Sequence, residues 1–98
     1  MAEGKIAEKD FERIMKALAN RRRLAILRLL KRGDGRKEGE ASVGDIAEEI
    51  RLSFKATSKH LGILSAADIV DREQRSLQMF YRLSPDLPVP ARAVISLL

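Results

Sequence analysis

The chain has 98 residues, of which 45% are hydrophobic and 34% charged, and its net charge is +5 at pH 7. This length and composition predict one soluble globular domain, because so short a chain has no room for a second hydrophobic core. The sequence contains no cysteine, which excludes disulfides and thiolate chemistry, and no apolar run approaching the roughly 20 residues that span a bilayer.

Two helices are predicted in the first third of the chain. The first covers residues 10–19, with Asp10 as its N-cap. Its apolar residues recur at i, i+3, i+4 and i+7 and are Phe11, Ile14, Met15 and Leu18. Asn20 is expected to cap a second helix that runs to Arg32 and ends at Gly33. Apolar residues cover much of the circumference of this second helix, so we expect it to be central and largely buried.

A helix-turn-helix is predicted in the middle of the chain. Residues 33–41 hold three glycines and five charged residues, which is typical of a loop. Ser42, followed by Asp45 three residues later, resembles a capping box at the start of a short helix. Ser53 can cap a further helix that extends to about residue 67. Two helices joined by a three- or four-residue turn form a helix-turn-helix, here over about residues 43–67.

After Asp68 the hydrophobic period changes from 3.6 residues to 2, which indicates β-strands. The alternating apolar residues of the main strand are Leu77, Met79, Tyr81 and Leu83. A partner strand over residues 69–73 and a turn at residues 74–76 complete a hairpin. This hairpin predicts a wing over about residues 69–83.

The tail is predicted to end in a short helix over residues 91–98, with Pro90 in its first turn. Its apolar residues, which would be too exposed on a lone domain, are Val94, Ile95, Leu97 and Leu98. The fold class is therefore mainly α with a small β-hairpin. We predict a winged helix-turn-helix of about five helices and a two-stranded wing, in a single domain over residues 1–98.

The second helix of the predicted helix-turn-helix carries the argument for DNA. At 100° per residue its Thr57, Leu61 and Leu64 share one buried stripe. The opposite side is polar, basic and free of acids, and it presents Lys55, Ser58, Lys59 and Gly62. Such side chains contact bases and phosphates, and a glycine allows close approach to a nucleic-acid backbone. A solvated helix face with two lysines is the alternative, and the position in the motif favours DNA.

Charge elsewhere supports the same interpretation less directly. Residues 1–32 carry ten bases against four acids, and a basic balance favours a polyanion such as nucleic acid, or an anionic membrane surface. A solvated surface that keeps the protein soluble is the alternative. The run at residues 21–23 is open between a DNA-backbone contact and pairing with acids across a dimer. In the wing, Arg75 is favoured for DNA, whereas Arg82 is interpreted as a solubilising strand residue. The residues predicted to bind DNA are Ser53, Phe54, Lys55, Ser58, Lys59, His60, Gly62, Arg72 and Arg75.

His60 is the only histidine, and we weigh two roles for it. Its place beside the buried stripe is consistent with a phosphate contact or with a hydrogen bond to the neighbouring helix. With one histidine and no cysteine, the chain lacks the nitrogen and sulfur ligands that transition metals prefer, and it lacks a serine–histidine–carboxylate pattern. We therefore predict no enzyme activity, no cofactor and no metal site.

Several segments resemble the ArsR-type transcriptional regulators. The matching pieces, in order, are Ala17-Leu18-Ala19-Asn20 with Arg23-Leu24, Val43-Gly44-Asp45-Ile46-Ala47, Ser58-Lys59-His60-Leu61, Ile69-Val70 and Tyr81-Arg82-Leu83. The resemblance covers about residues 10–84. It implies a homodimeric repressor that pairs through its first and last helices, reads a palindromic operator with its fourth helix and touches flanking DNA with the wing.

The resemblance also has two departures that concern metals. Many family members bind metals through cysteines at the start of the third helix, where this chain has Ser42 and Gly44. Others use carboxylates and histidines on the last helix, and residues 91–98 contain neither. We therefore expect a member that does not sense metals.

The predicted function is a sequence-specific regulator of double-stranded DNA, in the cytoplasm of a prokaryote and associated with the nucleoid when bound, with no membrane partner. A winged helix whose basic face docks an acidic protein is the alternative. The residues expected at the dimer interface are Phe11, Ile14, Met15, Leu18, Val94, Ile95, Leu97 and Leu98.

Overall fold

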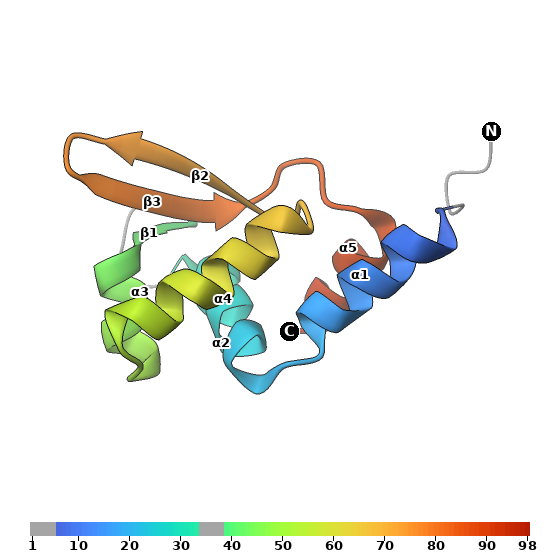
Figure 1. The fold of residues 1–98 in the computed structure, drawn as a ribbon, viewed down its shortest axis with the longest axis horizontal. Coiled ribbons are helices and arrows are strands. Elements are labelled where there is room, and N and C mark those ends of the chain that lie inside the picture. The colour runs from blue at the N-terminus through green and yellow to red at the C-terminus, as the bar shows by residue number, and fades with distance from the viewer. Residues whose placement is uncertain (1–5, 34–38) are drawn as a thin grey trace.

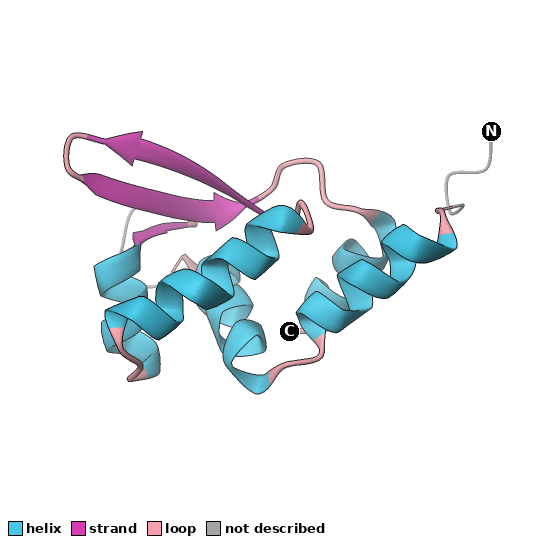
Figure 2. Ribbon diagram, in the orientation of Figure 1, coloured by secondary structure: helices cyan, strands magenta, loops and turns pink. Residues whose placement is uncertain are grey.

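The computed structural model describes residues 6–33 and 39–98. Its elements, in chain order, are α1 (Glu8–Leu18), α2 (Arg21–Arg32), β1 (Glu40–Ser42), α3 (Val43–Ile50), α4 (Phe54–Ala66), β2 (Val70–Arg75), β3 (Gln78–Leu83) and α5 (Val89–Ile95). The pair α3 and α4 forms the helix-turn-helix, and the β2–β3 hairpin projects from the body as a wing (Figures 1 and 2). The prediction of a mainly α winged helix-turn-helix is confirmed.

Local capping defines most helix ends where the sequence predicts them. The Asn20 side chain accepts hydrogen bonds from two backbone N–H groups in the first turn of α2, at 2.9 and 3.1 Å. Ser42 and Ser53 each accept one backbone N–H, at 3.1 Å, in the first turns of α3 and α4. Gly33 ends α2 with φ of 64°, a left-handed conformation that glycine adopts without strain. All four predicted boundary residues are confirmed.

The two terminal helices begin earlier than predicted. Helix α1 starts at Glu8 rather than Asp10, and no side chain caps it. Asp10 instead lies in the first turn, where a carboxylate is favourable near the helix N-terminus, and its Oδ1 is 3.4 Å from Nη2 of Arg13. Helix α5 starts at Val89 and ends at Ile95, so Pro90 does lie in its first turn.

A short strand that was not predicted lies beside the wing. Residues 34–38 of the predicted loop are outside the described residues, but Glu40–Ser42 forms β1, which pairs antiparallel with β3. The sheet therefore has three strands in the order β1-β3-β2. Three residues are too few to show an alternating pattern, so only the pairing with β3, in which Ala41 lies opposite Tyr81, identifies this strand.

The wing turn is one step further along the chain than predicted. The ladder pairs Arg75 with Gln78, which leaves Ser76 and Leu77 as a two-residue turn. Ser76 has φ of 58°, the left-handed conformation that such turns require. Leu77 is 96% exposed in this turn, so its predicted place among the alternating apolar residues of the main strand is wrong.

The hydrophobic core is built around α2, as predicted. Four of its residues are buried, and they are Ile26, Leu27, Leu29 and Leu30. Helices α1, α3, α4 and α5 and strand β3 all contact α2. Helix α1 also packs on α5 at the end of the molecule away from the wing (Figure 1). None of the helices in the described residues has the length and apolar character needed to cross a bilayer.

Candidate nucleic-acid interface

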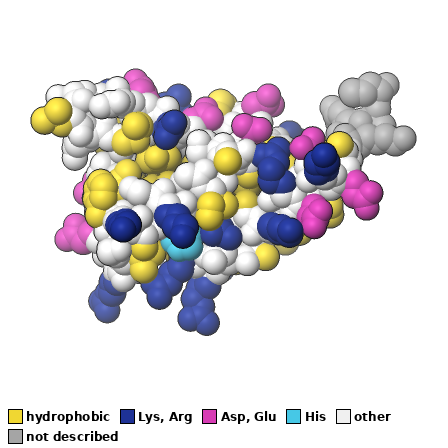
Figure 3. All heavy atoms as spheres, viewed as in Figure 1, with side chains coloured by type: hydrophobic (Ala, Val, Ile, Leu, Met, Phe, Trp, Pro, Cys, Tyr) yellow, Lys and Arg dark blue, Asp and Glu magenta, His cyan; other side chains and the backbone are white. Residues whose placement is uncertain are grey.

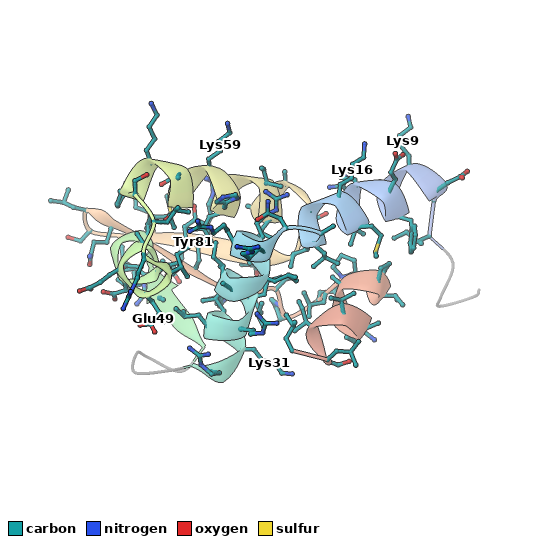
Figure 4. The ribbon with its side chains drawn as sticks, turned by 90° about the horizontal axis from the view of Figure 1, so that it is seen from below. Lys9, Lys16, Lys31, Glu49, Lys59 and Tyr81 are labelled. Atoms are coloured by element: carbon teal, nitrogen blue, oxygen red, sulfur yellow. The ribbon has the colours of Figure 1, made fainter. Side chains whose placement is uncertain are left out.

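Helix α4 divides into a buried face and an outer face. Thr57, Leu61 and Leu64 are completely buried, as their spacing predicts. Lys55 and Lys59 are exposed on the other side, and Lys59 points away from the body (Figure 4). The core contacts of the inner face therefore hold the outer face in a fixed orientation.

The outer face of α4 combines unpaired positive charge with open space. Neither Lys55 nor Lys59 forms an ion pair with any residue that the structure describes. Helix α4 contains no acidic residue. A Cβ atom added at Gly62 would meet nothing within 4 Å, so this part of the helix surface is bare and accessible. Such a surface can approach a polyanion closely and contact it through ammonium groups.

The other predicted residues at the start of α4 differ in accessibility. Phe54 is 63% exposed at the first position of the helix, and Ser53 is exposed while it caps that helix. Ser58 is half-buried. Phe54 and the wing-tip Leu77 both border a depression of about 280 Å³ between the helix-turn-helix and the wing. The aromatic side chain of Phe54 is therefore exposed at the start of α4, beside the lysines of that helix.

His60 contacts the neighbouring helix, one of the two roles predicted for it. Burial lowers the pKa of His60 below its ordinary value, and the neighbouring positive charges, Arg23 foremost, lower it further. The ring is therefore neutral at pH 7. Its Nδ1 lies 3.1 Å from Nη1 of Arg23 and must accept the hydrogen bond, because a guanidinium only donates.

Arg23 also binds the end of α1, a role that was not predicted from the sequence. Its Nε donates to the Ala17 carbonyl at 2.6 Å and its Nη2 to the Lys16 carbonyl at 3.2 Å. Together with the His60 contact, these bonds connect α1, α2 and α4. The sequence did contain a signal for this role. Positive charge at a helix N-terminus is unfavourable to the helix dipole, so an arginine at that position implies a compensating partner.

The two arginines before Arg23 lie elsewhere. Arg21 and Arg22 are exposed and border a depression of about 330 Å³ between α2 and α3, together with Arg28 and Glu49. The DNA-backbone contact or acid pairing predicted for the run at residues 21–23 therefore applies to Arg21 and Arg22 and not to Arg23.

The wing arginines lie in different surroundings. Arg72 is exposed. The Arg75 guanidinium stacks over the Phe80 ring, 4.1 Å from its centroid, and forms an ion pair with Glu40 of β1. Arg82 forms a surface ion pair with Glu73 at 3.6 Å, which agrees with its interpretation as a strand residue. In the free protein Arg75 therefore lies against the sheet rather than projecting from the wing.

The residues predicted at the dimer interface fall into two groups. Ile14, Leu18 and Ile95 are buried within the core of the chain itself. Five others remain at least partly accessible, and they are Phe11, Met15, Val94, Leu97 and Leu98. Phe11 is 45% exposed and Leu97 84% exposed, which is unusual for such large apolar side chains. Only the accessible residues can contact a partner subunit, so the predicted dimer interface is reduced to these five residues.

The chain is similar to known helix-turn-helix proteins in sequence and in fold. A helix-turn-helix domain family matches residues 18–73. The transcriptional activator HlyU of Vibrio cholerae is 35% identical over 85 residues, which cover 87% of this chain and 70% of HlyU. The transcriptional repressor SdpR of Bacillus subtilis is 34% identical over 71 residues, 72% of each chain. The fold is also similar to a solution structure from Mycobacterium bovis, with a TM-score of 0.73 and 28% sequence identity. The match covers 99% of this chain and 85% of that one. That protein is described as a homodimeric winged helix-turn-helix DNA-binding domain of a possible ArsR-family regulator.

Proposed function

The chain belongs to the ArsR-type winged-helix transcriptional regulators, and from that premise we propose that it is a homodimeric repressor that binds a palindromic DNA site and does not respond to metals. This family and fold are those of DNA-binding regulators rather than enzymes. The relatives include an activator and a repressor. Repression is proposed because the relative SdpR is a repressor.

One observation carries the proposal: the outer face of α4 is positive, unpaired and acid-free. Its lysines lie on the second helix of the helix-turn-helix, the element that enters the major groove in this architecture. Lysine can donate to guanine O6 and N7 or to phosphate oxygens. With the wing beside it, this surface is suited to a duplex rather than to a small ligand.

Selection of bound sequences from a random duplex pool tests this function. We expect enrichment of one site with two-fold symmetry, because a symmetric dimer binds two equivalent half-sites about one DNA turn apart. The affinity should fall steeply with salt as counterions are released. Enrichment of a site without two-fold symmetry would contradict the palindrome. Failure to bind any duplex would favour the alternative, an acidic protein partner.

We expect the protein to sediment at micromolar concentration as a dimer of two 11.0 kDa chains. The accessible apolar residues of α1 and α5 would be buried in an interface of at least roughly 1,000 Å². Leu97→Glu should shift the equilibrium to monomer, because it places a charge in that interface. This substitution is cleaner than removal of residues 91–98, since Ala91 and Ile95 belong to the core.

Leu77→Glu provides the matched control for dimerisation, because Leu77 is also a highly exposed leucine but lies in the β2–β3 turn, at the end of the molecule away from α1 and α5 (Figure 1). Its sedimentation should equal that of the unaltered protein. A monomer in the unaltered protein, or a dimer that Leu97→Glu leaves intact, would contradict the proposed interface.

DNA affinity is expected to be indifferent to zinc, cadmium and arsenite. These effectors require thiolates or clustered imidazoles and carboxylates, whereas the chain has no cysteine and one histidine. Among the described residues, no three histidine, aspartate or glutamate side chains are grouped closely enough to hold an ion. A DNA-binding titration with and without each ion measures this. A stoichiometric loss of affinity that a chelator reverses would show a site built from carboxylates.

A further inference from the structure

Helix α1 carries a row of positive side chains on the same side of the molecule as the outer face of α4. Lys9, Arg13 and Lys16 are spaced i, i+4 and i+7 and are all exposed. The ammonium groups of Lys9 and Lys16 point to the same side as that of Lys59 (Figure 4). In the space-filling view, basic side chains extend over both α4 and α1 on this face (Figure 3). The positive surface therefore extends beyond α4 onto α1.

A depression of about 420 Å³ lies between these two helices. Its basic lining residues are Lys9, Arg13, Lys16 and Arg23, and its apolar lining residues are Ala17, Ile63, Ala66 and Ala67. Glu12 is the only acid among the residues that border it, and its Oε2 lies 3.4 Å from the Nζ of Lys16. Four bases against one acid make the depression suitable for an anion.

Hydrogen bonds hold α1 in a fixed position relative to α4. The Arg13 guanidinium donates to the Ala66 carbonyl at the end of α4. Arg23 donates to the carbonyls of Lys16 and Ala17 and also contacts His60 on α4. These bonds use only the backbone of Lys16. Its side chain is exposed, and its ion pair with Glu12 is a surface pair that DNA phosphates can replace. DNA seated on α4 would therefore meet the α1 lysines at a defined distance.

We propose that Lys9 and Lys16 bind DNA phosphates, so that α1 extends the DNA-binding surface beyond α4 on the side opposite the wing. This inference rests on the proposed function. Helix α1 lies at the end of the molecule where the proposed dimer forms, and the wing lies at the other end (Figure 1). The contacts made by α1 would therefore fall on the phosphates between the two half-sites, whereas those of the wing fall outside them.

The test measures DNA affinity as a function of salt for Lys9→Gln and Lys16→Gln. Each variant should bind roughly fivefold more weakly at 0.1 M salt, and the slope of log affinity against log salt should fall by about 0.9 per lysine. The loss should be equal for all duplex sequences, because phosphate contacts do not read bases. Phosphate-ethylation interference should disappear between the half-sites and persist at their outer edges.

Glu12→Gln supplies a test of opposite sign. Removal of this carboxylate should strengthen DNA binding roughly threefold, because it relieves repulsion of the phosphates and releases Lys16 from its ion pair. A role limited to stabilising α1 would not produce this gain.

The controls remove the same charges from the other side of the molecule. Lys31 and Glu49 point away from the side that carries Lys9, Lys16 and Lys59 (Figure 4). Lys31 Nζ contacts the Ile95 carbonyl of α5 at 3.0 Å, so sedimentation of Lys31→Gln must first show that its dimer is intact. Neither Lys31→Gln nor Glu49→Gln should change the salt slope.

The outcomes separate this inference from the proposed function. If the unaltered protein binds no duplex, both are wrong. If Lys59→Ala weakens binding while Lys9→Gln and Lys16→Gln leave the affinity and the slope unchanged, the inference alone is wrong. Equal slope changes in Lys31→Gln would also contradict it, since the effect would then follow net charge rather than position.

Discussion

Replacing Leu61 with alanine is expected to lower the free energy of unfolding by about 2–5 kcal/mol. Leu61 is completely buried on the inner face of α4, so truncation leaves a cavity in addition to the loss of hydrophobic transfer energy. Domains of this size have total stabilities of only about 5–15 kcal/mol, so the loss takes a large share. Urea denaturation followed by circular dichroism measures the change.

Thr57→Val is the control on the same buried face. The Thr57 hydroxyl has no hydrogen-bond partner among the described residues, so its replacement by a methyl group removes an unsatisfied polar atom. We expect the free energy of unfolding to remain unchanged or to rise by about 1 kcal/mol. If Leu61→Ala were as mild as Thr57→Val, the inner face of α4 would not be packed as described.

Lys59→Ala and Lys55→Ala should each weaken DNA binding by about 1–3 kcal/mol where the lysine reads a base. Both side chains project from the outer face of α4 and make no ion pair among the described residues, so stability should change little. Measurement at moderate salt against the selected site and against single-base variants of it separates two kinds of contact. A base contact relaxes specificity at one position, whereas a phosphate contact weakens all sequences equally and lowers the salt slope.

Thermal unfolding of both lysine variants controls for damage to the fold, and Lys31→Gln controls for the loss of one positive charge. Unaltered affinity in both Lys55→Ala and Lys59→Ala would show that the outer face of α4 does not contact the DNA. The combination of a severe stability loss at Leu61 and a pure binding loss at Lys59 is what the two faces of one helix should produce.

Features that depend on neighbouring residues could be predicted from the sequence. The caps at Asn20, Ser42 and Ser53 and the end at Gly33 require only side-chain and backbone groups within a few positions. The division of α4 into a buried and an outer face follows from the 3.6-residue period. These local rules were sufficient to predict the helix-turn-helix and the wing, and with them the fold class.

Contacts between residues far apart in the chain could not be predicted in this way, because they depend on how the elements pack. Strand β1 exists only because Glu40–Ser42 meets the edge of β3, and the same pairing brings Glu40 to Arg75 and draws that arginine onto the sheet. Arg23 reaches His60 across 37 positions, and Arg13 reaches Ala66 across 53. No spacing rule connects such residues, because their distance depends on how the helices pack and not on the period of either helix. The sequence therefore predicted which helix presents its lysines, whereas packing decided that α1 presents its own lysines on the same side.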